Sequence, residues 1–346
     1  MRKEWNIKEL LPNLDGTNEI LYNAIPRICN SVGIIYGSGK LNNSNGEGVF
    51  RSADNWGIVT PLVSLPKGSG KISSMYMVSD TVIMVGTSFG QLFRFASPFS
   101  AVTKVMQMTT VGAYPVSWSW TSKGNLVFVS EYGWKGDTNN SRRVYKSPDA
   151  GVTWAEVYQI PQVSGTHIHK ILLDPYTDIL WVSNGDTVPR LTKLDPPDYT
   201  VGTVISTAIQ PTWGIVFEDY ILWIQDNAPS GVYKMLKSDN SLSLVLNLAT
   251  DFPSYRDTAY GAITDPTGRV FYATHPDVYN SLPCGFFTSD PPHDNWELIC
   301  EIKGLQNHRI GITHFVKADI NGVIAVYSGS SFTNRRTVYI SKSVRV

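Results

Sequence analysis

The chain has few cysteines and no excess of charge of either sign. It contains three cysteines in 346 residues, an odd number without the spacing of a metal-binding cluster, so neither a disulfide framework nor a cysteine-zinc site is expected. The 29 basic residues balance the 29 acidic residues. Because no basic run is present to bind a phosphate backbone, nucleic acid is not an expected partner.

Long apolar runs are also missing. No stretch of about 18 consecutive apolar residues occurs, which argues against a membrane-spanning helix. The N-terminal sequence MRKEWNIKELLPNLDG has no apolar core of the kind found in secretory signals. We therefore expect a soluble chain made in a cytoplasm. Later release by lysis, or assembly into a phage virion, stays open.

Helical periodicity is nearly absent as well. What the chain has instead is short runs of apolar, β-branched and aromatic residues, separated by clusters of Gly, Pro, Asn and Asp. The composition agrees, with 28 Gly, 20 Pro and 12% aromatic residues. This pattern predicts an all-β protein with many short strands and tight turns.

One unit recurs seven times along the chain. It is a strand, a small polar turn and a second strand, as in RVYKSPDAGVTWAEV (143–157) and GFFTSDPPHDNWELI (285–299). Equivalent positions lie 43 to 52 residues apart, at Ser52, Ser97, Ser147, Leu194, Lys237, Ser289 and Ser341. The mean spacing of about 48 residues is close to the period of a four-stranded propeller blade, and two further apolar strands precede most of these units.

The repeats predict one domain, residues 1–346, folded as a seven-bladed β-propeller of four-stranded antiparallel blades. The last repeat ends soon after its third strand. Residues 4–10, EWNIKEL, resemble the fourth strands of the other repeats. We therefore expect residues 4–10 to pair with residues 336–342 and close the ring, which leaves no exposed sheet edge at the join.

The stretch SPDAGVTW contains residue types that suit the turn between a third and a fourth strand. The Asp149 carboxylate can accept hydrogen bonds from nearby backbone N–H groups, and the Thr153 hydroxyl can bond back to the turn. Gly151 tolerates a positive φ, and Trp154 supplies a large apolar ring to place between sheets. With Ser147, these residues are interpreted as a structural staple.

This stretch is similar to the Asp-box, Ser-x-Asp-x-Gly-x-Thr-Trp, of sialidase-like (BNR-repeat) propellers, and weaker copies occur at 52–57 and 289–296. The run from SEYG to WVSNGD (130–186) also resembles bacterial and phage proteins described as putative glycosyl hydrolases. The resemblance implies a carbohydrate-active propeller whose Asp-box lies away from the ligand face. Sialidases carry Arg before Ile-Pro near the first inner strand, whereas this chain has Ala24 there and Arg27 after the proline. Authentic sialidase activity is therefore not expected.

The most informative candidate site lies within GTHIHKILLDPYTDILWVSNGD (165–186). His167 and His169 are two residues apart, so on a regular strand they share one face. Pairing across the DPYTD turn places His167 opposite Gly185, beside Asp186, and His169 opposite Ser183. Two imidazoles and a carboxylate can bind a divalent metal ion or act as base and acid. Alternatively, the pair lines a wet central channel.

The preceding repeat offers Glu131, Tyr132 and Trp134, a carboxylate, a phenol and a stacking ring that suit sugar chemistry, unless they form only a solvated loop. Propellers bind ligands on the face formed by the loops between second and third strands and by the connections between blades. A further ligand-binding candidate on that face is Trp213. Other candidates there, each alternatively plain surface, are Asp226, Asn227, Arg256, His275, Asp277 and Arg309.

Two functional classes stay open. The first is a hydrolase or lyase acting on a surface polysaccharide, in which His167 or His169 with Tyr132 would act as base and acid. Glu131 or Asp186 would orient them or neutralise charge. The second is a non-catalytic glycan-binding or structural module, such as a phage tail or receptor-binding protein with virion assembly partners. The only cofactor considered is a divalent metal ion.

Overall fold

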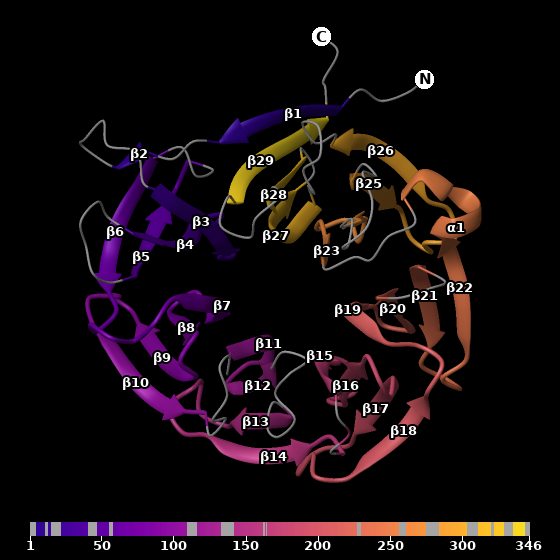
Figure 1. The fold of residues 1–346 in the computed structure, drawn as a ribbon, viewed down its shortest axis with the longest axis horizontal. Helices are drawn as coiled ribbons and strands as arrows, with labels where there is room; N and C mark the ends of the chain where they lie inside the picture. The colour runs from indigo at the N-terminus through magenta and orange to yellow at the C-terminus, as the bar shows by residue number, and fades with distance from the viewer. Residues whose placement is uncertain are drawn as a thin grey trace.

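The computed structural model describes residues 5–10, 13–14, 22–40, 47–54, 58–108, 116–132, 142–161, 163, 165–226, 230–255, 261–274, 284–302, 311–319, 322–328 and 335–342. The described strands form seven sheets. Figure 1 shows these sheets arranged as a ring, one for each repeat of the sequence. The prediction of an all-β propeller built from four-stranded antiparallel blades is confirmed, and one sheet carries an additional fifth strand.

Each blade runs from an innermost strand to an outer strand on the rim (Figure 1). Blades 1 to 3 consist of β3 (Tyr22–Cys29), β4 (Ile35–Lys40), β5 (Gly48–Ser52) and β6 (Ile58–Ser64); β7 (Ile72–Ser79), β8 (Val82–Thr87), β9 (Gln91–Ala96) and β10 (Val102–Gln107); and β11 (Val116–Lys123), β12 (Leu126–Tyr132), β13 (Arg143–Ser147) and β14 (Ala155–Gln159).

Blades 4 to 7 continue in the same order around the ring (Figure 1). They consist of β15 (His167–Leu173), β16 (Leu180–Gly185), β17 (Arg190–Leu194) and β18 (Gly202–Ser206); β19 (Pro211–Val216), β20 (Tyr220–Gln225), β21 (Gly231–Leu236) and β22 (Leu242–Asn247); β23 (Gly261–Thr264), β24 (Val270–Ala273), β25 (Cys284–Ser289) and β26 (Glu297–Ile302); and β27 (Gly311–Asp319), β28 (Gly322–Ser328), β29 (Arg335–Lys342) and β1 (Trp5–Leu10).

The ring closes through the N-terminal strand. β1 pairs with β29 in antiparallel register, from Trp5 opposite Lys342 to Leu10 opposite Thr337. This is the pairing expected from the sequence, shortened by one residue at each strand's N-terminal end. The fifth strand of blade 1 is β2 (Asn13–Leu14), which runs parallel to β6 and was not expected.

The burial of each strand follows from its place in the blade. Every described residue of β8 and β16 is buried, because both faces of a second strand pack against neighbouring blades. Outer strands such as β14 are mostly exposed. Large rings fill the spaces between blades, as where Trp181 meets Trp223 with ring centroids 6.2 Å apart. The continuous apolar runs in the sequence are therefore these doubly covered strands.

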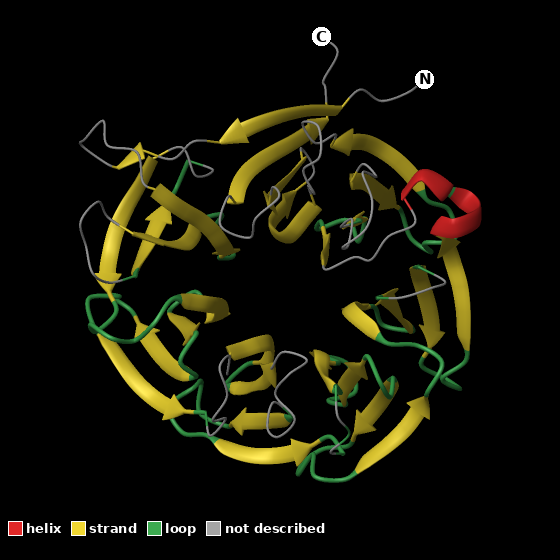
Figure 2. Cartoon of the chain, in the orientation of Figure 1, coloured by secondary structure: helices red, strands yellow, loops and turns green. Residues whose placement is uncertain are grey.

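Helix is a minor component of the described residues (Figure 2). α1 (Leu248–Asp251) begins after Asn247, whose side chain accepts a hydrogen bond from the N–H of Ala249, and a short 3-10 turn, η1, follows at Pro253–Tyr255. Within the described part of the chain, no helix has the length and apolar character needed to cross a membrane.

The SPDAGVTW stretch forms the turn between β13 and β14, as expected. Asp149 Oδ1 accepts hydrogen bonds from Ser147 Oγ (2.8 Å) and the Thr153 N–H (2.8 Å), and Oδ2 accepts one from Thr153 Oγ1 (2.6 Å). The bonds from Thr153, followed by those from Ser147 and the Val152 N–H, lower the pKa of Asp149 to about 2. The carboxylate is thus held by its own turn, which is a structural role.

Basic side chains link several neighbouring blades. Each one contacts the turn between the third and fourth strands of the next blade. Arg94 Nε donates to the Ala150 carbonyl oxygen (2.9 Å), and Lys146 Nζ donates to that of Pro197 (2.8 Å). Lys234 Nζ donates to the carbonyl oxygen of Pro292 (2.9 Å). All three donors lie on a third strand, so each couples its own blade to the turn of the next one around the ring.

Candidate functional site

The candidate residues gather where innermost strands begin and second strands end, in blades 3, 4 and 5. His167 opens β15 and pairs with Gly185, as the sequence indicated. The prediction that His169 pairs with Ser183 is wrong, because Ser183 pairs with Lys170. The register shifts between Ile168 and Lys170, so His169 is the extra residue of a β-bulge. Bulges of this kind re-aim side chains.

The same irregularity occurs in the innermost strand of the preceding blade. In β11 the register shifts between Ser117 and Trp120, so Trp118 lies in a bulge. Trp118 Nε1 donates a hydrogen bond to the backbone carbonyl oxygen of His169 (2.9 Å). The two bulges thus meet across the seam between blades 3 and 4 and fix the position of both residues.

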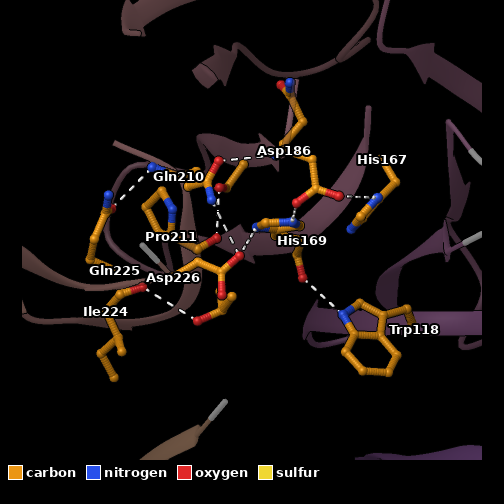
Figure 3. Close-up of polar contacts among 12 residues, drawn as sticks. Trp118, His167, His169, Asp186, Gln210, Pro211, Ile224, Gln225 and Asp226 are labelled. Carbon is orange, nitrogen blue, oxygen red and sulfur yellow. Dashed lines mark hydrogen bonds and ion pairs between the residues drawn. The ribbon is translucent and has the colours of Figure 1, made fainter. Parts of the chain in front are cut away.

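His167, His169 and Asp186 converge (Figure 3). His167 Nδ1 lies 3.5 Å from Asp186 Oδ2, and His169 Nε2 lies 4.0 Å from Asp186 Oδ1. The two imidazole centroids are 4.7 Å apart. Each of the three residues offers one possible ligand atom, and these three atoms all lie within 4.8 Å of one another. The structure therefore brings these three side chains together, as the sequence indicated.

A second layer of polar groups lies behind this cluster (Figure 3). His169 Nδ1 lies 3.8 Å from Asp226 Oδ2. Gln210 connects the two carboxylate-bearing residues, since its Oε1 accepts from the Asp186 N–H (3.0 Å) and its Nε2 donates to Asp226 Oδ2 (3.3 Å). The Gln210 N–H is in turn bonded to Gln225 Oε1 (3.0 Å). The arrangement holds Asp226 and Asp186 on opposite sides of one imidazole.

The backbone around the cluster is specialised. A Cβ atom added to Gly185 would lie 2.1 Å from His169 Cε1, so glycine is required for the imidazole to rest against the strand. Asp186 adopts a positive φ of 68°, an uncommon conformation for a residue with a side chain. Strained backbone of this kind often occurs at functional sites.

Burial sets the protonation state of His169. His169 is only 5% exposed. Its burial, and then the neighbouring His167, lower the pKa of His169 to about 3. The ring is therefore neutral at ordinary pH and offers a nitrogen lone pair. Burial also lowers the pKa of the next residue, Lys170, to about 8.

A row of rings leads from the surface to the cluster. Trp118 is 45% exposed. It stacks on Tyr132, with centroids 4.6 Å apart, and Tyr132 meets His167 edge-on at 4.6 Å. Tyr132 is thus brought to the histidines, as expected.

Glu131 has a different environment. It is fully buried (0% exposed). Its Oε1 accepts a hydrogen bond from the Tyr145 hydroxyl (2.8 Å), and its Oε2 accepts bonds from the N–H groups of Arg142 (3.2 Å) and Arg143 (3.3 Å). These contacts tie β12 to β13 and to the residue before it. We therefore assign Glu131 a role in holding the blade together.

The remaining candidates divide into two groups. Trp213, in β19, lies beneath the Lys170 ammonium, which is 3.8 Å from the ring centroid. This contact gives Trp213 a place in the seam between blades 4 and 5. The candidates that lie outside the described residues are Trp134, Asn227, Arg256, His275, Asp277 and Arg309.

The sequence carries a signal for Asp226 in the spacing of the repeats. Asp186 directly follows β16, and Asp226 directly follows β20, so the two residues hold equivalent positions in successive blades. Gln210 and Trp118 had no comparable signal, because their roles depend on contacts between different blades.

Comparisons with known proteins bear on the fold alone. No protein-family model matches the chain, and no curated protein matches it. Among solved structures, a chain of "Crystal Structure of Mitotic Checkpoint Complex" is similar with a TM-score of 0.62 and 9% identity, over 98% of this chain and 93% of that one. The "WD40 beta propeller domain of Doa1" is similar with the same score and identity, over 97% of both chains.

Proposed function

We propose that the protein binds a carbohydrate at the end of blades 3 and 4 where Trp118, Tyr132, His167 and Asp186 lie together. The observation that carries the proposal is the row of rings, which begins at the exposed Trp118 and continues through Tyr132 to His167. Asp186 adds a carboxylate 3.5 Å from His167 at the inner end of the row.

The chemistry of the row suits a sugar. Aromatic faces contact the apolar C–H surface of a pyranose ring, and a few convergent polar groups fix its orientation through the hydroxyls. The sialidase-like pattern of the sequence supports the same ligand class. We therefore propose a polysaccharide or glycan of a cell surface as the ligand.

Cleavage of the bound polysaccharide is a second candidate function, favoured by the contacts among Tyr132, His167 and Asp186. A phenol beside an imidazole that also faces a carboxylate provides groups able to give and take a proton. In this proposal His167 and Tyr132 act as base and acid, and Asp186 orients the imidazole. Glu131 has no part in it, because its carboxylate is held within blade 3.

The test is a binding screen of the full chain against glycans and bacterial surface polysaccharides, followed by calorimetry on each positive. Trp118→Ala is expected to weaken binding by about tenfold or more, equivalent to about 1.4 kcal/mol. Tyr176→Ala is the control, since Tyr176 is also an exposed ring (57%) but lies in the turn at the opposite end of blade 4.

Cleavage is read in the same samples. New reducing ends without unsaturation indicate a hydrolase, and unsaturated uronate products indicate a lyase. Binding without either product leaves a binding module. The proposal fails when no carbohydrate binds, or when Trp118→Ala binds as well as the unchanged chain.

A further inference from the structure

We infer that His167, His169 and Asp186 form a binding site for a divalent transition-metal ion of the zinc class, with Asp226 as the outer partner of His169. The inference does not depend on the carbohydrate proposal, because its probe is the metal ion alone.

The ligand atoms lie near the separations that such an ion needs. Ligands bound to zinc at 2.0–2.1 Å in a tetrahedron lie about 3.4 Å from one another. His167 Nδ1 and His169 Nε2 lie 3.5 and 4.0 Å from the two oxygens of Asp186. One ligand atom from each of the three residues lies within 4.8 Å of the other two, so binding a shared ion draws the three side chains closer together.

The second ring nitrogen of His169 is also arranged as in metal sites. A histidine that binds a metal through one nitrogen usually directs the other nitrogen at a carboxylate or a carbonyl. His169 directs Nε2 at Asp186 and places Nδ1 3.8 Å from Asp226. Gln210 holds Asp226 in that position. The site therefore has both an inner and an outer shell.

The charge at the site favours a cation. In the described part of the chain, the ion pairs of Asp186 are with the two imidazoles, and no Lys or Arg neutralises it. A divalent ion would compensate the carboxylate charge without displacing any basic side chain.

The donor set selects the type of ion. Two imidazoles and one carboxylate suit zinc, cobalt, nickel or copper, whereas calcium and magnesium prefer oxygen ligands. Three protein ligands also leave a fourth position open to water or to a bound molecule, which is the pattern of catalytic rather than structural zinc sites.

The experiment is a calorimetric titration of the chelator-treated full chain with Zn²⁺, with Co²⁺ absorption spectra as a second readout. We expect saturable binding of a single ion per chain, a tetrahedral Co²⁺ spectrum and a raised melting temperature with Zn²⁺. Asp186→Asn is the main variant, because it keeps the side-chain shape and replaces no buried ring. It should weaken binding by about 100-fold or more, and Asp226→Asn by roughly 10- to 100-fold.

Two control variants should bind the ion as the unchanged chain does. Asp178→Asn changes an exposed carboxylate at the far end of blade 4, and His293→Phe removes a buried imidazole of blade 6. Failure to bind any ion, or equal affinity in Asp186→Asn with an unchanged melting temperature, would overturn the inference. The probe is the metal ion alone and the carbohydrate screen uses glycans, so the outcome of either test leaves the other proposal to stand or fall separately.

Discussion

At the scale of single residues, His293 shows how a titratable group can serve as packing. Its imidazole is fully buried (0% exposed). It lies between the rings of Phe217 and Trp296, with centroid distances of 4.8 and 6.5 Å. Burial is the main reason that the pKa of His293 falls from 6.5 to about 4. The folded chain therefore keeps this ring neutral over a pH range in which an unfolded chain would protonate it.

The pH dependence of stability follows from that difference. Between pH 6.5 and about pH 4 the unfolded state binds the proton more tightly, so the stabilising contribution of neutral His293 is complete above pH 6.5 and is lost as the pH falls. We expect the unchanged chain to lose roughly 3 kcal/mol more than His293→Phe between pH 7 and pH 4. Urea unfolding of both proteins at the two pH values measures this, and parallel losses would contradict it.

Gly151 is a residue whose backbone requires glycine. Its φ is +87°, and an added Cβ would lie 2.5 Å from Met84 Sδ, in the preceding blade. Because the Met84 side chain can move, most of the cost of Gly151→Ala should come from the left-handed backbone. We expect a loss of about 1–2 kcal/mol in the free energy of unfolding. The same loss in a Met84→Ala background would identify the backbone as the cause, whereas a much smaller one would identify the clash.

At the scale of elements, neighbouring blades are joined by ion pairs of basic residues. The contribution of each pair to the free energy of unfolding depends on its burial. Lys237, in the turn after β21, pairs with Asp174 at the end of β15 (2.8 Å), with side-chain exposures of 11% and 1%. Lys123, at the end of β11, pairs with Asp178 (2.6 Å), with exposures of 44% and 46%. The two pairs have the same chemistry, and only the first is shielded from water.

Removing the two lysines should therefore have unequal effects. Lys237→Met leaves the Asp174 carboxylate buried without its partner and should cost about 2–4 kcal/mol of unfolding free energy. Lys123→Met should cost less than about 1 kcal/mol, because water and salt screen an exposed pair. Denaturant unfolding compares them directly. Equal losses of unfolding free energy in the two variants would show that burial does not determine how much these ion pairs stabilise the fold.

At the scale of the whole molecule, the ring depends on a strand from the opposite end of the sequence. β1 supplies the outer strand of blade 7 by pairing with β29. The N- and C-terminal ends of the described chain lie close together at this blade (Figure 1). Without β1, the edge of β29 would present unpaired N–H and C=O groups to other molecules.

Deletion of residues 1–10 tests this closure. We expect the melting temperature to fall by roughly 10 °C or more and the shortened chain to self-associate through β29. A synthetic peptide of residues 1–12 should reverse the self-association by adding the missing strand. Sedimentation and thermal unfolding report both effects. A stable monomeric deletion variant would show that β1 is dispensable.

The sequence by itself determined the features that depend on neighbouring residues. The repeats predicted the blades, the SPDAGVTW stretch predicted a turn around Asp149, and the resemblance of residues 4–10 to fourth strands predicted the closure. The opposition of His167 and Gly185 followed from a short hairpin. Local chain geometry is sufficient for the turn and the hairpin, because turn chemistry and side-chain alternation act over a few residues. The closure followed from the repeat pattern, because a repeat that lacks its fourth strand can be completed only by a matching strand elsewhere in the chain.

The tertiary structure decided the features that depend on two blades or on an irregular register. The bulge at His169 turned its ring toward Asp226 of the next blade, a contact that regular pairing could not indicate. Glu131 looked like part of a site, but the Tyr145 hydroxyl and two backbone N–H groups hold it inside its own blade. Gln210 became a site residue only through its bonds to Asp186 and Asp226. In each case the deciding partner lies across a strand pair or a blade seam. There, the number of residues between two positions in the sequence does not predict the distance between their side chains.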